Sequence, residues 1–119
     1  MRVYISGPIT GRDLLDAKWD FEKAKTEIER RGHTVINPMD MANWCLSWRT
    51  YMALAKVTIC SGDVDAIYFM DGWTQSRGCL LERKWAHERR IAQVYNDISL
   101  FSRVEQEYDY MSPVSTAEV

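Results

Sequence analysis

Short apolar runs alternate with longer amphipathic stretches along most of this chain. Runs rich in β-branched and aromatic residues occupy positions 2–6, 33–36, 64–70 and 91–95, and turn-forming pairs such as Gly-Pro, Asn-Pro and Asn-Asp follow them. Runs of this kind predict β-strands. The third is apolar without interruption after its second residue, which is typical of a central parallel strand covered on both faces.

The stretches between these runs have the spacing of amphipathic helices. Apolar residues recur three and four positions apart over residues 13–31, 48–60 and 77–90, so we predict a helix in each. Ser47 and Ser76 precede the second and third stretches and are expected to cap them. Regular alternation of strands with helices predicts an α/β domain with a parallel sheet and helices on both faces.

Two segments have no clear period. Residues 39–46 are expected to form a loop or a short helical turn over the end of the sheet. The polar, acidic stretch 97–119 leaves three options open, namely a last helix, a contact with a neighbouring subunit, or disorder. A chain of 119 residues suits one compact domain, and we place it at residues 1–96 with 97–119 as a tail.

Composition narrows the function classes. A formal net charge of −2 is unlike the basic surface of general nucleic-acid binders, so no nucleic-acid polymer is expected as a partner. The cysteines Cys45, Cys60 and Cys79 form no CxxC pair, and the two histidines lack metal-ligand spacing. We expect reduced thiols, no metal and no cofactor in a cytoplasmic protein. No membrane association is expected, since no apolar stretch reaches spanning length.

The segment from Asp65 to Glu82 is the strongest candidate for a site. It reads as a buried strand, a polar turn and a helix that carries a carboxylate in its second turn. Open α/β sheets bind ligands at the carboxyl ends of strands, and a helix N-terminus offers unpaired N–H groups to an anion. Ser76 is expected to cap this helix, and Gly78 to leave room for a phosphate or sugar.

Glu82 is the candidate for chemistry in that segment. Helical side chains lean toward the N-terminus, so this carboxylate is aimed back at the predicted anion site. There it can attack an anomeric carbon or act as a base. The alternative is a solvated glutamate that pairs with a neighbouring base such as Arg89.

The first strand and the loop after it supply further candidates. Tyr4 lies in mid-strand, where its phenol can donate to a carboxylate at the strand end or simply belong to the core. The following loop can bring backbone N–H groups close to a ligand, or it is a turn that merely needs glycine. It consists of Gly7, Pro8, Ile9, Thr10 and Gly11.

Three residues near the third strand remain ambiguous. Asp71 stands at the end of that strand where it can orient a ribose hydroxyl or pair with Glu82, or it is only the first residue of an Asp-Gly turn. Trp73 can stack on a base, although tryptophans in small domains more often pack in cores and interfaces. Arg77, beside the helix start, either contacts a phosphate or is an ordinary surface residue.

Three pieces of the chain together resemble a known superfamily. They are Val3 to Gly11, Ile36-Asn37-Pro38, and Asp65 to Glu82 with its Gly-Trp-Thr-Gln-Ser-Arg-Gly turn. In order and spacing they resemble the nucleoside 2-deoxyribosyltransferase-like superfamily over about residues 2–95, and most closely its small, mostly phage and bacterial branch of unknown function. The resemblance implies a flavodoxin-like or Rossmann-like three-layer sandwich with a parallel sheet of four or five strands.

The resemblance also implies an activity. Characterised members cleave or exchange the N-glycosidic bond of deoxynucleosides or their 5′-monophosphates through a covalent glycosyl-glutamate. By position, Glu82 resembles the nucleophile and Tyr4 the residue that orients it. The implied partners are a small-molecule nucleoside or nucleotide and further copies of the chain, in a homodimer or higher homo-oligomer. The implied sugar and phosphate contacts are Gly7, Ile9, Gly11, Ser76 and Gly78.

Two departures from the family pattern leave alternatives open. The characterised enzymes carry an aspartate on the helix before the central strand, where this chain has Ala55-Lys56-Val57. Asp71 is then a substitute for the missing acid. Pro8 and Thr10 replace more polar or basic residues of the monophosphate hydrolases. One alternative is a nucleotide-binding module without turnover, and a weaker one is a protein-interaction module that uses the tryptophans and the acidic tail.

Overall fold

Parallel strands and α-helices alternate along the chain in the computed structural model, which describes residues 1–40 and 47–111, with side chains to residue 106. The strands are β1 (Arg2–Ser6), β2 (Thr34–Ile36), β3 (Ala66–Phe69) and β4 (Ala92–Tyr95). The helices are α1 (Leu14–Arg30), α2 (Trp48–Ile59), α3 (Arg77–Glu88) and α4 (Phe101–Met111), with short 3₁₀ turns η2 (Trp73–Gln75) and η3 (Ile98–Leu100).

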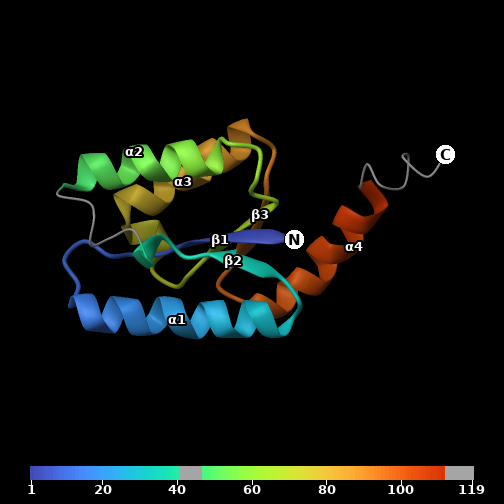
Figure 1. Ribbon diagram of the computed structural model, residues 1–119, viewed down its shortest axis with the longest axis horizontal. Coiled ribbons are helices and arrows are strands. Elements are labelled where there is room, and N and C mark those ends of the chain that lie inside the picture. Colours follow the sequence, from blue (N-terminus) through green and yellow to red (C-terminus); the bar gives the residue numbers. More distant parts are fainter. Residues whose placement is uncertain (41–46, 112–119) are drawn as a thin grey trace.

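The strands form one parallel sheet in the order β2-β1-β3-β4. Helix α1 covers one face of the sheet, and α2 with α3 covers the other (Figure 1). This arrangement confirms the predicted α/β class and the four-strand form of the predicted sheet. The strand order is that of the flavodoxin-like doubly wound folds.

The two faces of β1 belong to two different cores. Val3 and Ile5 pack with Ala17, Phe21 and other residues of α1. Tyr4 lies in the second core, with residues of α2 and α3. Successive strand residues point to opposite faces, so Ser6 shares the α3 side with Tyr4. This alternation places the two hydroxyl-bearing residues of β1 beneath α3.

The helix starts follow the local sequence. The side chains of Asp13, Ser47 and Ser76 each accept a hydrogen bond from a backbone N–H of the first turn of α1, α2 and α3. Each of these bonds satisfies a donor that the helix itself leaves unpaired. The caps therefore fix where α3 begins, and with it the position of its second turn.

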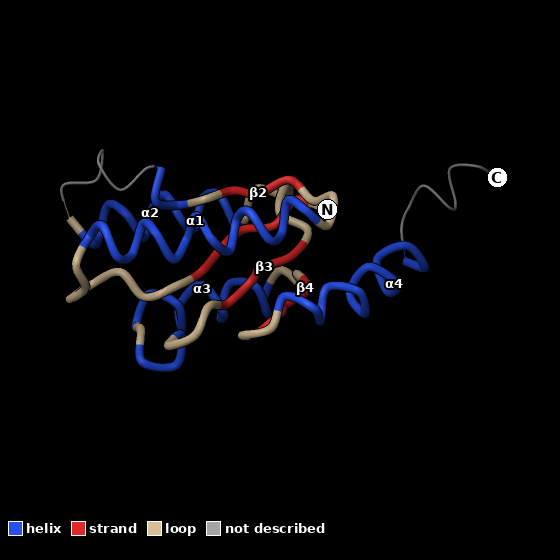
Figure 2. The backbone as a smooth tube through the Cα atoms, turned by 90° about the horizontal axis from the view of Figure 1, so that it is seen from below, coloured by secondary structure: helices blue, strands red, loops and turns tan. Residues whose placement is uncertain are grey.

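The stretches without a clear period are only partly described. Residues 38–40 form a single 3₁₀ turn, whereas 41–46 and 112–119 lie outside the described residues. The start of the tail forms η3 and α4, which is the helical option of the three. Phe101 is buried in the α1-side core, and His33 Nε2 lies 2.7 Å from Glu105 Oε1. Beyond these contacts, α4 projects from the body of the domain (Figures 1 and 2).

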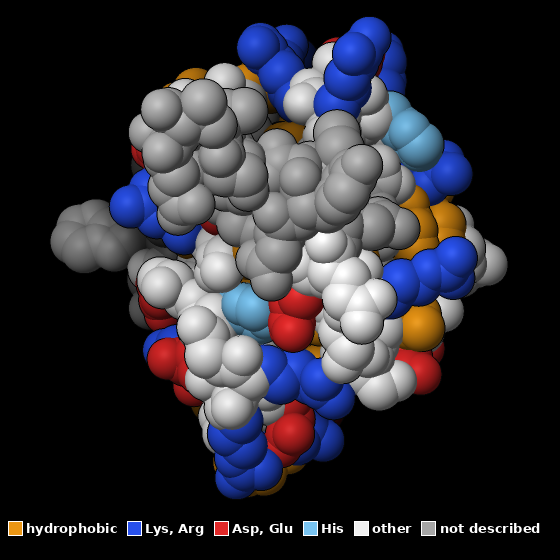
Figure 3. All heavy atoms as spheres, turned by 90° about the vertical axis from the view of Figure 1, so that its right-hand side faces the viewer, with side chains coloured by type: hydrophobic (Ala, Val, Ile, Leu, Met, Phe, Trp, Pro, Cys, Tyr) orange, Lys and Arg blue, Asp and Glu red, His pale blue; other side chains and the backbone are white. Residues whose placement is uncertain are grey.

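The end from which α4 projects is viewed directly in Figure 3. Basic and acidic side chains are interspersed on its visible described surface. Within residues 1–40 and 47–111, no helix is both long and apolar enough to cross a membrane.

Gly7 is required by close packing at the end of β1. A Cβ built on this residue would lie 2.7 Å from Met70 Sδ and 3.0 Å from Phe21 Cζ. Real Cβ atoms do not approach other heavy atoms so closely, so a side chain here would have to displace the thioether or the ring. Gly7 thus lets the loop after β1 cross closely over the α1-side core.

Gly7→Ala should therefore lower the free energy of unfolding by about 1–3 kcal/mol, the usual effect of overpacking a core. Urea denaturation measures the change. Thr10→Ala, an exposed position in the same loop, is the matched control and should stay within about 0.5 kcal/mol of the parent protein. Equal stability of the Gly7→Ala protein and its parent would contradict the packing argument.

Candidate active site

The topology opens a crevice between the ends of β1 and β3. These strands are neighbours in the sheet. After β1 the chain turns to α1 on one face, and after β3 it turns to α3 on the other face. Loops that leave adjacent strands in opposite directions create the place where doubly wound proteins bind ligands.

A cavity of about 230 Å³ lies in this crevice. Its volume corresponds to roughly eight water molecules in the liquid, which suits a sugar or a single ring. Three segments form its walls: the loop after β1 with the start of α1, the first turns of α2, and the first turns of α3. The lining residues are Gly7, Ile9, Thr10, Leu14, Ser47, Trp48, Tyr51, Met52, Ser76, Gly78, Cys79 and Glu82.

Glu82 occupies the inner end of this cavity. It sits in the second turn of α3 with only 3% of its surface exposed, and Ser6 Oγ donates a hydrogen bond to its Oε1 at 2.8 Å. Arg89 is exposed, beyond the other end of α3. The alternative of a solvated glutamate paired with Arg89 is therefore wrong.

Tyr4 lies beside this carboxylate and is fully buried. Tyr4 Oη and Glu82 Oε2 are both buried, and neither has a hydrogen-bond partner among the described residues. Buried polar atoms in folded proteins are nearly always bonded, and each one left unsatisfied costs about 1–3 kcal/mol. The Tyr4 hydroxyl still lies close enough to the carboxylate to lower its pKa, and both groups can bind a polar group that enters the cavity.

Burial controls the ionisation of the site. It raises the pKa of Glu82 to about 7, although the adjacent hydroxyls of Tyr4 and Ser6 act in the opposite direction. Burial, and then the charge of Glu82, raise the pKa of Tyr4 well above its ordinary value. Burial also raises the pKa of the Cys79 thiol. Near neutral pH, Glu82 therefore exists both as an acid and as a carboxylate, while Tyr4 and Cys79 stay protonated.

An outer cleft of about 490 Å³ adjoins the cavity. The cleft adds Pro8, Gln75 and Arg77 to five residues that it shares with the inner cavity, namely Ile9, Thr10, Trp48, Ser76 and Gly78. The Arg77 guanidinium lies 4.6 Å from the centre of the Trp48 ring, which is a cation–π distance. The site thus has a carboxyl at its inner end and a cation with a helix N-terminus at its mouth.

Gly78 lines both spaces and has a second role. A Cβ built there would lie 3.2 Å from Met52 Sδ and 3.7 Å from Trp48 Nε1. The space beside Gly78, which we expected to hold a phosphate or sugar, is therefore partly filled by side chains of α2. The absence of a side chain lets α2 approach α3 closely enough to wall the cavity.

Three of the predicted site residues lie elsewhere. Asp71 is exposed and lines a separate depression with residues such as Arg12 and Asn96, so the structure does not bring it to Glu82. Trp73 packs against Phe69 and Tyr95, 5.7 and 4.8 Å between ring centres, as a core tryptophan does. Gly11 is absent from the lining of both the inner cavity and the outer cleft, and its φ of 80° shows a turn role.

The structure adds residues that sequence reasoning missed. Ser6 binds Glu82, and its position two residues after Tyr4 on the same strand face would have revealed it. Leu14, Tyr51 and Met52 line the cavity from α1 and α2. The spacing of the last two, three and four residues after Trp48, indicates a common helix face but not which site that face meets.

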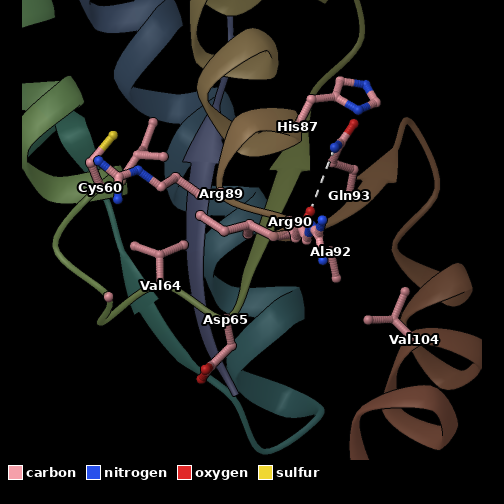
Figure 4. A pocket seen from close by; sticks show the side chains of 12 residues that line it. Cys60, Val64, Asp65, His87, Arg89, Arg90, Ala92, Gln93 and Val104 are labelled. Carbon is pink, nitrogen blue, oxygen red and sulfur yellow. Dashed lines mark hydrogen bonds between the residues drawn. The ribbon is translucent and has the colours of Figure 1, made fainter. Parts of the chain in front are cut away.

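A larger cavity, of about 850 Å³, lies at the opposite edge of the sheet. Figure 4 shows Arg89 and Arg90 in its middle, with Cys60 and Val64 on one side and Val104 of α4 on the other. The two arginines are exposed and end a helix whose C-terminal dipole they complement. None of the residues lining it has a buried polar atom without a partner, so the Glu82 cavity is the better candidate site.

The part of the chain that the structure describes contains no cluster of metal-binding side chains. There, no three His, Cys, Asp or Glu side chains gather in a way that could hold a metal ion.

Comparison with known proteins yields a family match. Residues 1–95 match the family described as "Domain of unknown function (DUF4406)". No curated protein and no solved structure matches the chain significantly.

The elevated pKa of Glu82 makes stability depend on pH. Its folded-state value of about 7 exceeds the ordinary 4.5, so the folded protein holds this proton more tightly and loses stability as pH rises between these values. Glu82→Gln removes the ionisation. Its free energy of unfolding relative to the parent should increase by about 2–3 kcal/mol from pH 5 to pH 8.

Chemical denaturation at both pH values measures this difference. Glu88→Gln, an exposed position on the same helix, is the matched control. If the two variants follow pH in the same way, the carboxyl of Glu82 does not carry the predicted burial penalty.

Proposed function

The chain belongs to the family described as a domain of unknown function (DUF4406), and this description names no activity. From the geometry of the site, we propose that the protein cleaves or transfers an N-glycosidic bond. The substrate class is a nucleoside or its 5′-monophosphate. The proposal includes membership of the nucleoside 2-deoxyribosyltransferase-like superfamily. This membership is supported by the flavodoxin-like strand order and by the glutamate in the crevice between the ends of β1 and β3.

The observation that carries the proposal is the free oxygen of Glu82. Oε1 is held by Ser6, whereas Oε2 is buried at the inner end of a sugar-sized cavity and has no hydrogen-bond partner in residues 1–40 and 47–111. A fixed carboxylate with one free oxygen can attack an anomeric carbon. A buried, unpaired carboxylate is costly to maintain, which argues for a role in function rather than in stability.

The proposed reaction has two steps, as in retaining glycosidases. Glu82 Oε2 attacks C1′ while the electron pair of the C1′–N bond passes to the base, which takes up a proton from solvent, and a glycosyl ester forms. Water, or the nitrogen of a second base, then attacks C1′, the C1′–O bond to Glu82 breaks, and the attacking group gives a proton to solvent. Ser6 is a positioning residue that holds the carboxylate through its hydrogen bond to Oε1. Tyr4 is the second positioning residue, since its hydroxyl lies beside the carboxylate and can donate to it when the substrate binds.

The mouth of the site suits a 5′-phosphate. The first turn of α3 opens toward the outer cleft, which Ser76 and Arg77 line. Backbone N–H groups at a helix N-terminus and a guanidinium both bind phosphate. In this arrangement the sugar lies between the phosphate and Glu82.

A nucleotide-binding module without turnover is the second candidate. Its support is that Glu82 is the only carboxyl among the described residues that line the cavity. Retaining glycosidases place a second carboxyl about 5 Å from the first to protonate the leaving group. Asp71, the substitute expected from the sequence, lies outside this cavity.

Glu82→Ala should abolish release of free base from a panel of nucleosides and 5′-monophosphates, by a factor of roughly 10³ or more. Tyr4→Phe keeps the ring and removes the hydroxyl, so a smaller loss of roughly 10-fold is expected. Chromatography detects the base, and mass spectrometry of the quenched protein detects the glycosyl ester. Glu88→Ala is the control. Equal base release by the Glu82→Ala and parent proteins would refute the assignment.

The pH profile tests the role of the carboxyl. A nucleophile must be ionised, so kcat/KM should rise with pH through an apparent pKa near the value of about 7 set by burial of Glu82. Were the protonated carboxyl the catalytic acid, kcat/KM would fall over the same interval. Initial rates between pH 5 and pH 9 distinguish the two roles.

A further inference from the structure

The inner cavity is lined by a single ionisable carboxyl and, among the described residues, by no Lys or Arg. Glu82 is the only ionic side chain among its described lining residues, and no Lys or Arg reaches it. Residues 41–46, which precede the cavity residue Ser47, contain no acidic residue and no Lys or Arg. The cavity therefore presents a negative charge with no fixed cation to balance it.

The wall on the α2 side is aromatic. Trp48 and Tyr51 both line the cavity. Trp48 already holds one cation, since the Arg77 guanidinium lies 4.6 Å from its ring centre in the outer cleft. Aromatic faces attract cations, and proteins use aromatic side chains to bind quaternary ammonium ligands in this way.

The described residues around the cavity include no good proton donor for a departing base. Besides Glu82, the nearby ionisable groups are the Tyr4 phenol, the Tyr51 phenol and the Cys79 thiol. Phenols and thiols are weak acids near neutral pH, and a general acid works best when its pKa lies near the working pH. An ordinary neutral base would leave as an anion and needs such a donor.

From this combination we infer that the site selects nucleosides or nucleotides whose base carries a positive charge at the glycosidic ring, such as N-ribosylpyridinium or 7-alkylpurinium compounds. The inference rests on the proposed function and names its substrate class. A cationic ring matches the carboxylate and the aromatic wall, and it leaves without a proton.

The proposed step balances without a further reactant. Glu82 Oε2 donates an electron pair to C1′, and the pair of the C1′–N bond passes to the ring nitrogen, which loses its positive charge. The base leaves as a neutral molecule. Water then attacks C1′, the C1′–O bond to Glu82 breaks, and one proton goes to solvent.

Binding of a ring without a sugar tests the selectivity apart from turnover. By calorimetry at pH 8, the cation 1-methylnicotinamide should bind at least about tenfold more tightly than neutral nicotinamide. Glu82→Gln and Trp48→Leu should each remove most of this preference, whereas Glu88→Gln should keep it. Equal affinities in the parent protein, or binding of neither compound, would overturn the inference.

Turnover is tested with substrates matched in shape. Free base should form at least about tenfold faster from 7-methylguanosine 5′-monophosphate than from guanosine 5′-monophosphate, and nicotinamide mononucleotide should also be cleaved. Faster cleavage of the neutral nucleotide would overturn the inference and leave the proposed function intact. If 1-methylnicotinamide binds preferentially and no nucleotide is cleaved, the proposed activity fails and the cationic ligand class applies to the binding module.

Discussion

Burial of one carboxyl group is the constraint on which the rest of this site depends. Glu82 is almost fully removed from water and accepts a hydrogen bond from Ser6. Removing a carboxylate from water is costly, so the group either holds its proton or finds partners. Here its second oxygen and the neighbouring Tyr4 hydroxyl have no hydrogen-bond partner in the part of the chain that the structure describes. Stability is thus given up at a position where a ligand can restore it, as is common at functional sites.

The fold supplies each condition for this burial. Alternation along β1 turns Tyr4 and Ser6 toward α3, and the Ser76 cap fixes the turn of α3 that carries Glu82. Gly78 lets α2 approach, so that aromatic and thioether side chains close the cavity. The same helix N-terminus and Arg77 leave the mouth electropositive. Charge therefore changes from a cation at the mouth to an acid at the inner end along one short path, which matches the nucleotide ligand that we propose.

Much of this could be predicted from the sequence, because the signals are local. Strand periods, helix periods and the turns between them depend on residues that are adjacent in sequence. The parallel α/β order and the caps Ser47 and Ser76 could therefore be predicted from the sequence. The sequence also predicted that Glu82 lies in the second turn of the helix that follows the central strand. It further predicted a loop that contains Gly7 at the same edge of the sheet. The sequence did not show why residue 7 must be glycine, because a side chain there would collide with Phe21 and Met70, which are remote in sequence.

Tertiary packing decided which of the remaining candidates share a cavity. Asp71 and Trp73 lie close to the site in sequence but turn to other surroundings, whereas Tyr51 and Met52 reach it from a different helix. A periodic pattern identifies the buried face of a helix but not the element that it meets. Local sequence patterns are therefore enough to place the elements, the sheet edge and the carboxyl. The walls around that carboxyl depend on the folded chain, because they are made by contacts between segments far apart in sequence.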